Sequence, residues 1–318
     1  MRRLLLVFLL ALLLGCVQKT ALNETHKLVD MAGKEVFFNK SPERAVFLAG
    51  ESWIYALGIK DKVVAVSDTA KRNPIPLKID PKIAEMPSVG DMSKANDEAI
   101  LSLNPDVIVV WDEPPGYKET AKRLERLGIP IVRLGYIDSY PDDICQEAFL
   151  LGKVFGAEKR AEKVCDFVKK KWNEVIAKKP EKAVKVLYSF TAPTYIACNV
   201  STQPYVVFIN NVGGEVISPE CNATWVQVSK EWILEANPEV WIISYYAPYN
   251  ETAILTDPAF QDVKAVKNGR VYKESYKPLQ FLEPYFLLTV YEYSQWINPG
   301  SFDIEEEEKE LLEQVYLS

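Results

Sequence analysis

Two thirteen-residue segments of the chain share one pattern of apolar and polar positions. They run from Glu98 to Val110 and from Glu231 to Ile243, and six of the thirteen positions are identical. Apolar residues at helical spacing lead to Asn-Pro, and proline disfavours helical geometry in the residue before it. The nearly continuous apolar run that follows is typical of a parallel strand buried on both faces. The repeat therefore predicts two related α/β lobes.

Other apolar segments predict the rest of an N-terminal lobe, which we place at residues 42–141. Its further elements are expected to be strands at 45–48, 62–66 and 128–134 and helices at 52–57 and 117–127. Strands that alternate with helices predict a parallel sheet with right-handed crossovers. In a lead-in at 16–41, Asp30-Met-Ala-Gly-Lys predicts a hairpin-like turn between two small strands.

The same alternation of strand and helix patterns predicts a C-terminal lobe at residues 180–318. Its further elements are expected to be strands at 184–190 and 269–272 and helices at 206–212, 285–296 and 304–317. Between the lobes, residues 142–179 contain no proline and only two glycines, and helical spacing on either side of Gly156 predicts a short helix followed by a long one. Such a linker is stiffer than most, so we expect a nearly fixed separation of the lobes.

The N-terminus has the layout of a secretory signal. Arg2 and Arg3 precede an apolar run that is too short for the ~20 residues needed to span a bilayer. The ending Leu-Leu-Gly-Cys resembles a lipobox, which predicts cleavage after residue 15 and lipidation of Cys16. The alternatives are a plain secretory signal and an uncleaved signal anchor.

Four further cysteines, an even number, suit an oxidising compartment. Their pairing does not follow from the sequence, but neighbouring segments favour Cys145 with Cys165 and Cys198 with Cys221. Buried free thiols are the alternative. A zinc site is less favoured, because no Cys-x-x-Cys occurs.

Composition narrows the function classes. With 318 residues, 48% of them hydrophobic and 25% charged, the chain can form two cores. The net charge of -7, without a basic run, argues against nucleic acid as a partner. The single histidine, His26, lies in the lead-in, so Ser-His-Asp and Cys-His catalysis lack a base. No dinucleotide or P-loop motif occurs; a carboxylate pair, as in glycoside hydrolysis, remains the enzymatic alternative.

The segments around the predicted strand ends are rich in aromatic and acidic residues and almost free of Lys and Arg. Ligands of open α/β folds bind outside the carboxyl ends of strands, and aromatic walls with a few polar groups suit a small-molecule cleft. The alternative is that these aromatic rings merely cap the strands. The candidate ligand-binding residues in these segments are Glu51, Asp68, Trp111, Asp112, Tyr195, Trp225, Tyr245 and Tyr246.

Seven motifs in a fixed order carry a family resemblance. They are Asp30-Met-Ala-Gly-Lys-Glu-Val, Ser41-Pro-Glu-Arg-Ala-Val, Tyr55-Ala-Leu-Gly, Val89-Gly-Asp-Met, Asn104-Pro-Asp-Val-Ile, Trp225-Val-Gln-Val-Ser and Asp257-Pro-Ala-Phe. Over roughly residues 28–300, the chain resembles the substrate-binding lipoproteins of ABC importers, of the iron-siderophore and cobalamin type. The resemblance implies two Rossmann-like lobes joined by a single long rigid helix.

The resemblance also implies roles for particular residues. Glu98 and Glu231 occupy the positions at which the cobalamin-binding member forms salt bridges with arginines of two permease subunits. The alternative is that each is only an acid near a helix N-terminus, where the helix dipole stabilises its negative charge. Trp111, Tyr195 and Trp225 fall where that member has aromatic pocket residues.

The likeness further directs attention to the segment 276–285, which contributes Gln280 and Tyr285 as ligand candidates and lacks the arginine often seen there. Five acids near the predicted cleft favour a neutral or cationic ligand over an anionic one: Glu51, Asp68, Asp91, Asp112 and Glu283. A corrinoid or a neutral or cationic iron chelate fits this charge. Haem bound through a tyrosine and an oxyanion such as molybdate are alternatives.

These expectations combine into one hypothesis. The chain is a receptor anchored by lipid on the outer face of the cytoplasmic membrane, and it delivers a metal chelate to an ABC permease dimer with ATPase subunits. It performs no turnover chemistry and has no intrinsic cofactor or metal site, since the ligand itself contains the chelated metal. The rival from another class is a secreted carboxylate-dependent hydrolase.

Overall fold

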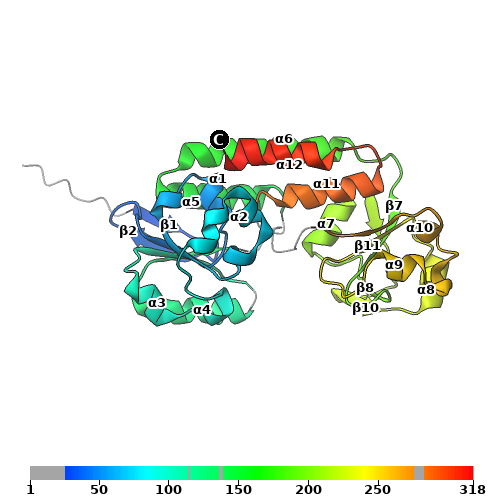
Figure 1. The fold of residues 1–318 in the computed structure, drawn as a ribbon, viewed down its shortest axis with the longest axis horizontal. Helices are drawn as coiled ribbons and strands as arrows, with labels where there is room; N and C mark the ends of the chain where they lie inside the picture. Colours follow the sequence, from blue (N-terminus) through cyan, green and yellow to red (C-terminus); the bar gives the residue numbers. More distant parts are fainter. Residues whose placement is uncertain (1–25, 114, 136–138, 276–282, 318) are drawn as a thin grey trace, which may run out of the picture.

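The computed structural model describes residues 26–113, 115–135, 139–275 and 283–317. Two α/β lobes lie side by side, and long helices run along one side of both (Figure 1). The fold class expected from the sequence, α/β with two lobes, is confirmed. The predicted signal segment, Cys16 and Gln280 lie outside the described residues. No helix in the described part of the chain is long and apolar enough to cross a membrane.

A short antiparallel hairpin opens the described chain. Strands β1 (His26–Val29) and β2 (Glu35–Phe38) pair with each other. Between them, Asp30 Oδ1 accepts hydrogen bonds from the backbone N–H of Ala32 at 3.1 Å and of Lys34 at 2.8 Å. The predicted hairpin turn is confirmed, and the Asp30 side chain explains its sequence.

The N-terminal lobe contains a four-stranded parallel sheet in the order β4-β3-β5-β6. Its strands are β3 (Ala45–Phe47), β4 (Val63–Val66), β5 (Val107–Trp111) and β6 (Ile131–Leu134). Its helices are α1 (Trp53–Ala56), α2 (Pro74–Ile79), α3 (Asp97–Ser102) and α4 (Pro115–Leu124). Both faces of β5 are buried: Ile108 packs in a cluster with Ile100 of α3, whereas Val109 joins the core beneath the long helices. Hence the strand sequence is continuously apolar.

The C-terminal sheet differs from its prediction because it is mixed. Its order is β10-β8-β7-β11-β12, with β9 also paired to β7. The strands are β7 (Val184–Ser189), β8 (Tyr195–Ala197), β9 (Gly214–Val216), β10 (Trp225–Gln227), β11 (Val240–Ile243) and β12 (Val271–Lys273). Strands β8 and β10 are antiparallel additions. A tight turn, in which the backbone N–H of Phe190 bonds the carbonyl of Tyr195, reverses the chain after β7 and so prevents a helical crossover there.

The repeated segments have the same backbone geometry. Helix α3 is followed by Asn104 with φ 45°, and helix α8 (Lys230–Ala236) ends at Asn237 with φ 47°. Asparagine tolerates this left-handed conformation better than most residues with a side chain. Each asparagine therefore stops its helix and turns the chain into β5 or β11, as the repeat predicts.

The linker consists of α5 (Asp142–Phe155) and α6 (Glu158–Ala177). Gly156 ends α5 with φ 71°, and a Cβ on Gly152 would lie only 2.9 Å from Ala161 Cβ, so both glycines are required where the helices meet. A disulfide joins Cys145 of α5 to Cys165 of α6, the pairing that the sequence favours. At 1.5 Å per residue, α6 is roughly 30 Å long, and it extends over both lobes (Figure 1).

The last helices return across the molecule. Helix α11 (Phe286–Ile297) packs on α6 and on α7 (Pro204–Asn211), and α12 (Ile304–Leu311) lies alongside α6 (Figure 1). The buried Lys171 of α6 binds Glu307 at 2.9 Å and Glu310 at 2.6 Å. A final π-helical turn, Leu312–Tyr316, brings the hydroxyl of Tyr316 within 3.3 Å of that of Ser52. Although α12 falls in the stretch expected to form the C-terminal lobe, its end packs on the N-terminal lobe.

Candidate functional site

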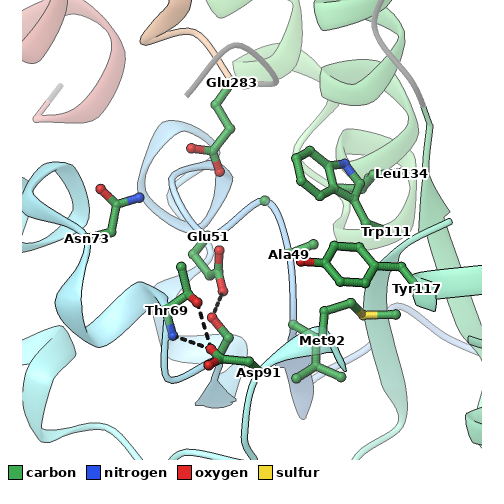
Figure 2. A pocket seen from close by; sticks show the side chains of 13 residues that line it. Ala49, Glu51, Thr69, Asn73, Asp91, Met92, Trp111, Tyr117, Leu134 and Glu283 are labelled. Carbon is green, nitrogen blue, oxygen red and sulfur yellow. Dashed lines mark hydrogen bonds between the residues drawn. The ribbon is translucent and has the colours of Figure 1, made fainter. Parts of the chain in front are cut away.

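A cavity of about 80 Å³ lies at the carboxyl ends of the N-terminal strands (Figure 2). Its wall is formed by residues at or after the ends of β3, β4, β5 and β6, together with one residue of α4 and one that precedes α11. The lining residues are Leu48, Ala49, Gly50, Glu51, Ser67, Thr69, Asn73, Asp91, Met92, Trp111, Tyr117, Leu134 and Glu283. Within the described residues, this wall contains acids and aromatic rings but neither Lys nor Arg.

The partly buried Glu51 and the buried Glu283 contribute carboxyl groups to the wall. Glu51 accepts a hydrogen bond from the Ser67 hydroxyl, and Glu283 Oε1 accepts one from the Ser52 backbone N–H at 3.0 Å. Burial raises the pKa of Glu51 above its ordinary value. Burial and then the charge of Glu51 raise the pKa of Glu283 to about 7. A cation in the cavity would favour the charged forms of both acids.

Asp91 is held at the same wall. Its Oδ1 accepts hydrogen bonds from the backbone N–H of Thr69 at 2.6 Å and from the Thr69 hydroxyl at 2.7 Å. The exposed Arg72 reaches Asp91 Oδ2 at 3.3 Å but does not line the cavity. Three carboxyl groups therefore lie at the cavity wall, two of them with raised pKa values and the third partly neutralised by a surface arginine.

Aromatic rings face these acids. The rings of Trp111 and Tyr117 stack with centroids 6.4 Å apart. Figure 2 shows them on one side of the cavity, with Glu51, Asp91 and Glu283 on the other. A ligand with an apolar body and a neutral or positive polar part fits between such walls.

The C-terminal lobe has a second aromatic surface, and none of its described rings lines the cavity. Trp225 stacks on Phe190 at 4.7 Å and on Tyr205 at 5.1 Å, and Tyr195 lies 5.9 Å from it. Tyr246 contacts Phe190 edge-on and is 47% exposed.

Tyr246 has a perturbed hydroxyl group. Burial raises its pKa, and Tyr117 of the N-terminal lobe is among the groups that add to the shift.

Glu274 supports this surface from beneath. It accepts hydrogen bonds from the hydroxyls of Tyr188 and Tyr293 and, at 2.8 Å, from the backbone N–H of Tyr245. Burial raises the pKa of Glu274 to about 7. Tyr245, one of the predicted ligand residues, is thus positioned through its backbone, and its ring packs edge-on against Tyr246 at 5.5 Å.

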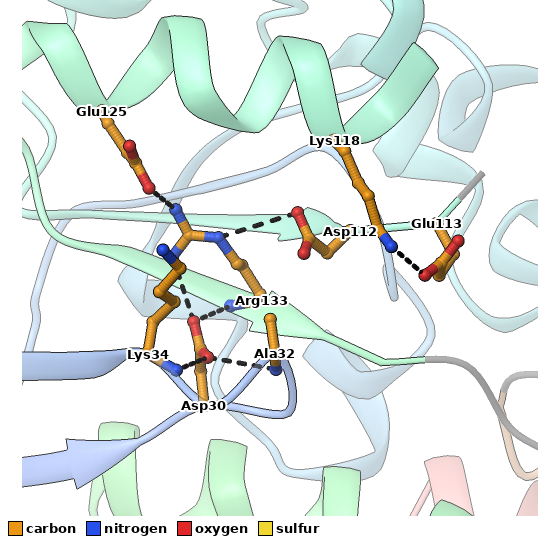
Figure 3. A network of polar contacts seen from close by, with 8 residues as sticks. All are labelled: Asp30, Ala32, Lys34, Asp112, Glu113, Lys118, Glu125 and Arg133. Atoms are coloured by element: carbon orange, nitrogen blue, oxygen red, sulfur yellow. Dashed lines mark hydrogen bonds and ion pairs between the residues drawn. The ribbon is translucent and has the colours of Figure 1, made fainter. Parts of the chain in front are cut away.

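Other predicted ligand residues do not reach the cavity. Asp112 lies 3.8 Å from the buried Arg133, which also binds Asp30 and Glu125 (Figure 3), so its carboxylate belongs to an ion-pair network on β6. Asp68 accepts a hydrogen bond from the Ser88 hydroxyl and is absent from the lining.

The structure does not support Tyr285 as a ligand-binding residue. It is fully buried and stacks on Tyr316 at 4.9 Å. The return of the final helical turn to the N-terminal lobe, which the sequence pattern did not show, covers this ring. Tyr285 is therefore a core residue in the structure.

Several lining residues were missing from the predicted site. Ser67 and Thr69 flank the predicted Asp68, and it is they, not Asp68, that line the cavity. Tyr117 had a signal, because it begins the predicted helix after Trp111. Asn73 is the N-cap of α2, where its side chain accepts from Ile75 N at 3.1 Å, and no ligand signal marked it.

Two other predictions concern the surface and the cysteines. Glu98 and Glu231 are both exposed, each in the first turn of its repeated helix. Cys198 and Cys221 form the second disulfide in the pairing that the sequence favours. In the parts of the chain that the structure describes, no group of three His, Cys, Asp or Glu side chains is arranged to hold a metal ion.

The two lobes, the stiff helical connection and the cavity at the strand ends define a two-lobed binding protein. A family model described as periplasmic binding protein matches residues 45–274. The chain belongs to this family, whose members are the substrate-binding proteins of ABC transporters, and it is a solute-binding protein.

Individual relatives agree with this assignment. The ABC transporter substrate-binding lipoprotein YvrC of Bacillus subtilis (strain 168) is 25% identical over 287 residues, which cover 86% of this chain and 85% of the relative. The vitamin B12-binding protein of Vibrio campbellii is 28% identical over 245 residues, or 74% of this chain and 82% of the relative. A periplasmic solute binding protein from Veillonella parvula DSM 2008 shares the fold, with a TM-score of 0.73, 24% identity and coverage of 92% of this chain and 93% of that one.

Proposed function

We propose that this chain captures a neutral or cationic metal chelate or a corrinoid between its lobes and delivers it to a two-subunit permease with ATPase subunits. The observation that carries the proposal is the cavity wall, in which three acids face two aromatic rings and, among the residues that the structure describes, no Lys or Arg takes part. Opposite charge would orient the ligand, and the rings would bury its apolar surface.

The ligand-binding residues form two groups under this proposal. Glu51, Asp91 and Trp111 bind the ligand from the N-terminal lobe, and Tyr195, Trp225 and Tyr246 from the C-terminal lobe. The relative named as a vitamin B12-binding protein supports a corrinoid as the ligand class. Haem remains a candidate, since tyrosines are close to the cleft, whereas the acidic wall disfavours an oxyanion.

Glu98 and Glu231 dock the receptor on the permease in this proposal, and Cys16 carries the lipid that holds it on the outer face of the cytoplasmic membrane. The relative named as a lipoprotein supports the anchor. Exposure of both glutamates supports docking, because a charge that pairs with a partner must be accessible before binding.

The receptor performs no turnover chemistry in this proposal. The rival is a hydrolase that uses a carboxylate pair, for which Glu51 and Glu283 are the obvious acids. Family membership favours the receptor, since its members bind and deliver solutes.

Native mass spectrometry of the chain without its lipid anchor, residues 17–318, with elemental analysis of the same sample distinguishes the two. We expect a retained ligand and a stoichiometric transition metal after gentle buffer exchange. Multiple-turnover hydrolysis of a glycoside panel by the wild type, abolished in Glu51→Gln, would overturn the receptor proposal.

A further inference from the structure

The repeat contains two pairs of identical residues that the fold does not explain. Four of the six identical pairs serve the core, the helix stop or the strand: Ile100 and Ile233, Asn104 and Asn237, Pro105 and Pro238, and Val107 and Val240. The two remaining pairs are Glu98 with Glu231 and Leu101 with Leu234. All four of these side chains are exposed.

The leucines are unusual in their position. Leu101 is 47% exposed and Leu234 is 37% exposed. A single exposed leucine needs no explanation, but here the same side chain is exposed at the same place in both lobes. Each leucine is three residues after its glutamate, a spacing that puts both on one face of a helix. Each lobe therefore presents one carboxylate and one apolar side chain together.

Glu98 and Glu231 differ from two nearby acids in that they form no ion pair within the described residues. Two nearby acids are paired within the chain, Asp97 with Arg123 and Asp257 with Lys230. Within the described residues, no intramolecular ion pair involves Glu98 or Glu231. Their charge is available to a partner.

Both pairs lie on the same side of the molecule. Figure 1 shows α3 and α8 at the ends of the two lobes that are farthest from α6. A partner that spans the lobes on that side meets the same Glu and Leu arrangement twice. This suits a partner built from two like subunits.

We propose that Leu101 and Leu234 are apolar anchors of the docking surface, each inserting into a shallow apolar pocket of one permease subunit beside the basic group that binds Glu98 or Glu231. The inference rests on the proposed function, because it takes a two-subunit membrane permease as the partner. It adds a nonpolar contact to the two charge contacts.

The test measures binding of the mature chain to its cognate permease–ATPase complex in lipid nanodiscs. Leu101→Gln and Leu234→Gln keep good helix propensity while removing the apolar contact. The matched control is Phe149→Gln, because Phe149 is an exposed apolar residue of helix α5, 38% accessible, outside the repeat. Melting temperatures of all variants verify that folding is retained.

We expect each leucine variant to weaken binding about tenfold and the double variant about a hundredfold, as burial of a leucine side chain would predict. The Phe149 control should bind like the wild type. A double variant within twofold of the wild type would overturn the anchor role while leaving the proposed function intact. A wild-type chain that binds no permease would overturn both.

Discussion

At the scale of single residues, the cavity acids determine how the site responds to pH. Glu283 is buried beside Glu51, and its pKa is raised from 4.5 to about 7. The folded protein keeps this proton over a range in which the unfolded chain releases it. The contribution to stability is therefore complete below pH 4.5 and is lost as pH rises through about 7.

We predict that Glu283→Gln flattens this dependence. The amide stays neutral and can still accept the Ser52 N–H bond, so the loss of unfolding free energy between pH 5 and pH 7.5 should shrink by up to roughly 3 kcal/mol. Urea unfolding at the two pH values measures it, with the exposed Glu119→Gln as control. Equal pH dependence in wild type and Glu283→Gln would contradict the assignment.

Cation preference is tested at the same wall. Cobinamide serves as a positively charged corrinoid probe, and Glu51→Gln should lower its affinity about tenfold at pH 7.5, since one charged partner is lost. Arg72→Gln removes a cation beside Asp91 and should leave the affinity equal or higher. Isothermal titration measures both variants. If a scan of substitutions at charged residues showed that only Lys or Arg substitutions weaken binding, the ligand would be anionic and not cationic.

At the scale of elements, the Asn-Pro of the repeat sets the helix ends. Asn237 has φ 47° and its Oδ1 also accepts from Lys264 N at 2.8 Å. Alanine and glycine both remove that hydrogen bond, but only glycine adopts the left-handed conformation without cost. We predict that Asn237→Ala is less stable than Asn237→Gly by about 1–2 kcal/mol in urea unfolding. Equal stability of the two variants would show that this geometry is not what stops α8.

Elements with a strong period could be predicted, and those that depend on distant contacts could not. The buried strand after each Asn-Pro and the helix pair around Gly156 have local signals, and both are present. Strands β8 and β10 are three residues long and gain their pairing from one another, so no period marks them. For the same reason, covering of Tyr285 by the final turn had no local signal.

The site residues also divide into those that a local pattern could predict and those that depend on distant contacts. Trp111 ends the apolar strand β5 and Glu51 lies in the loop after β3, and their place at the cavity followed from these positions. Asp112 also follows a strand, but the buried Arg133 opposite it holds it in a structural network. The sequence alone does not show that Asp112 and Arg133 meet, because the pairing of β5 with β6 decides which side chains come into contact.

At the scale of the whole molecule, α6 and α12 brace the two lobes. The core beneath them is continuous from Phe47 in the first lobe to Tyr188 in the second. Lys171 fixes α12 to α6 through Glu307 and Glu310. A joint of this kind favours small changes of lobe separation on binding.

Small-angle X-ray scattering of the mature protein tests this stiffness. We predict the same radius of gyration, within error, with and without saturating cobinamide, because the helices must bend for the lobes to close. The same comparison of the radius of gyration with and without cobinamide on Lys171→Met tests whether the ion pairs between α6 and α12 hold the lobes at a fixed separation. A contraction of several ångströms in the wild type would show a hinge that the described helices do not suggest.

The central claim is that the cleft binds a neutral or cationic metal chelate. Thermal melting of residues 17–318 against ferric siderophores, haem, cobalamin, cobinamide, molybdate and tungstate tests it most directly. A ligand at a hundred times its Kd stabilises by about 2.7 kcal/mol, which shifts the midpoint by a few degrees. We predict a shift with a neutral or cationic chelate or corrinoid and none with the oxyanions. A shift with molybdate or tungstate alone would contradict the account.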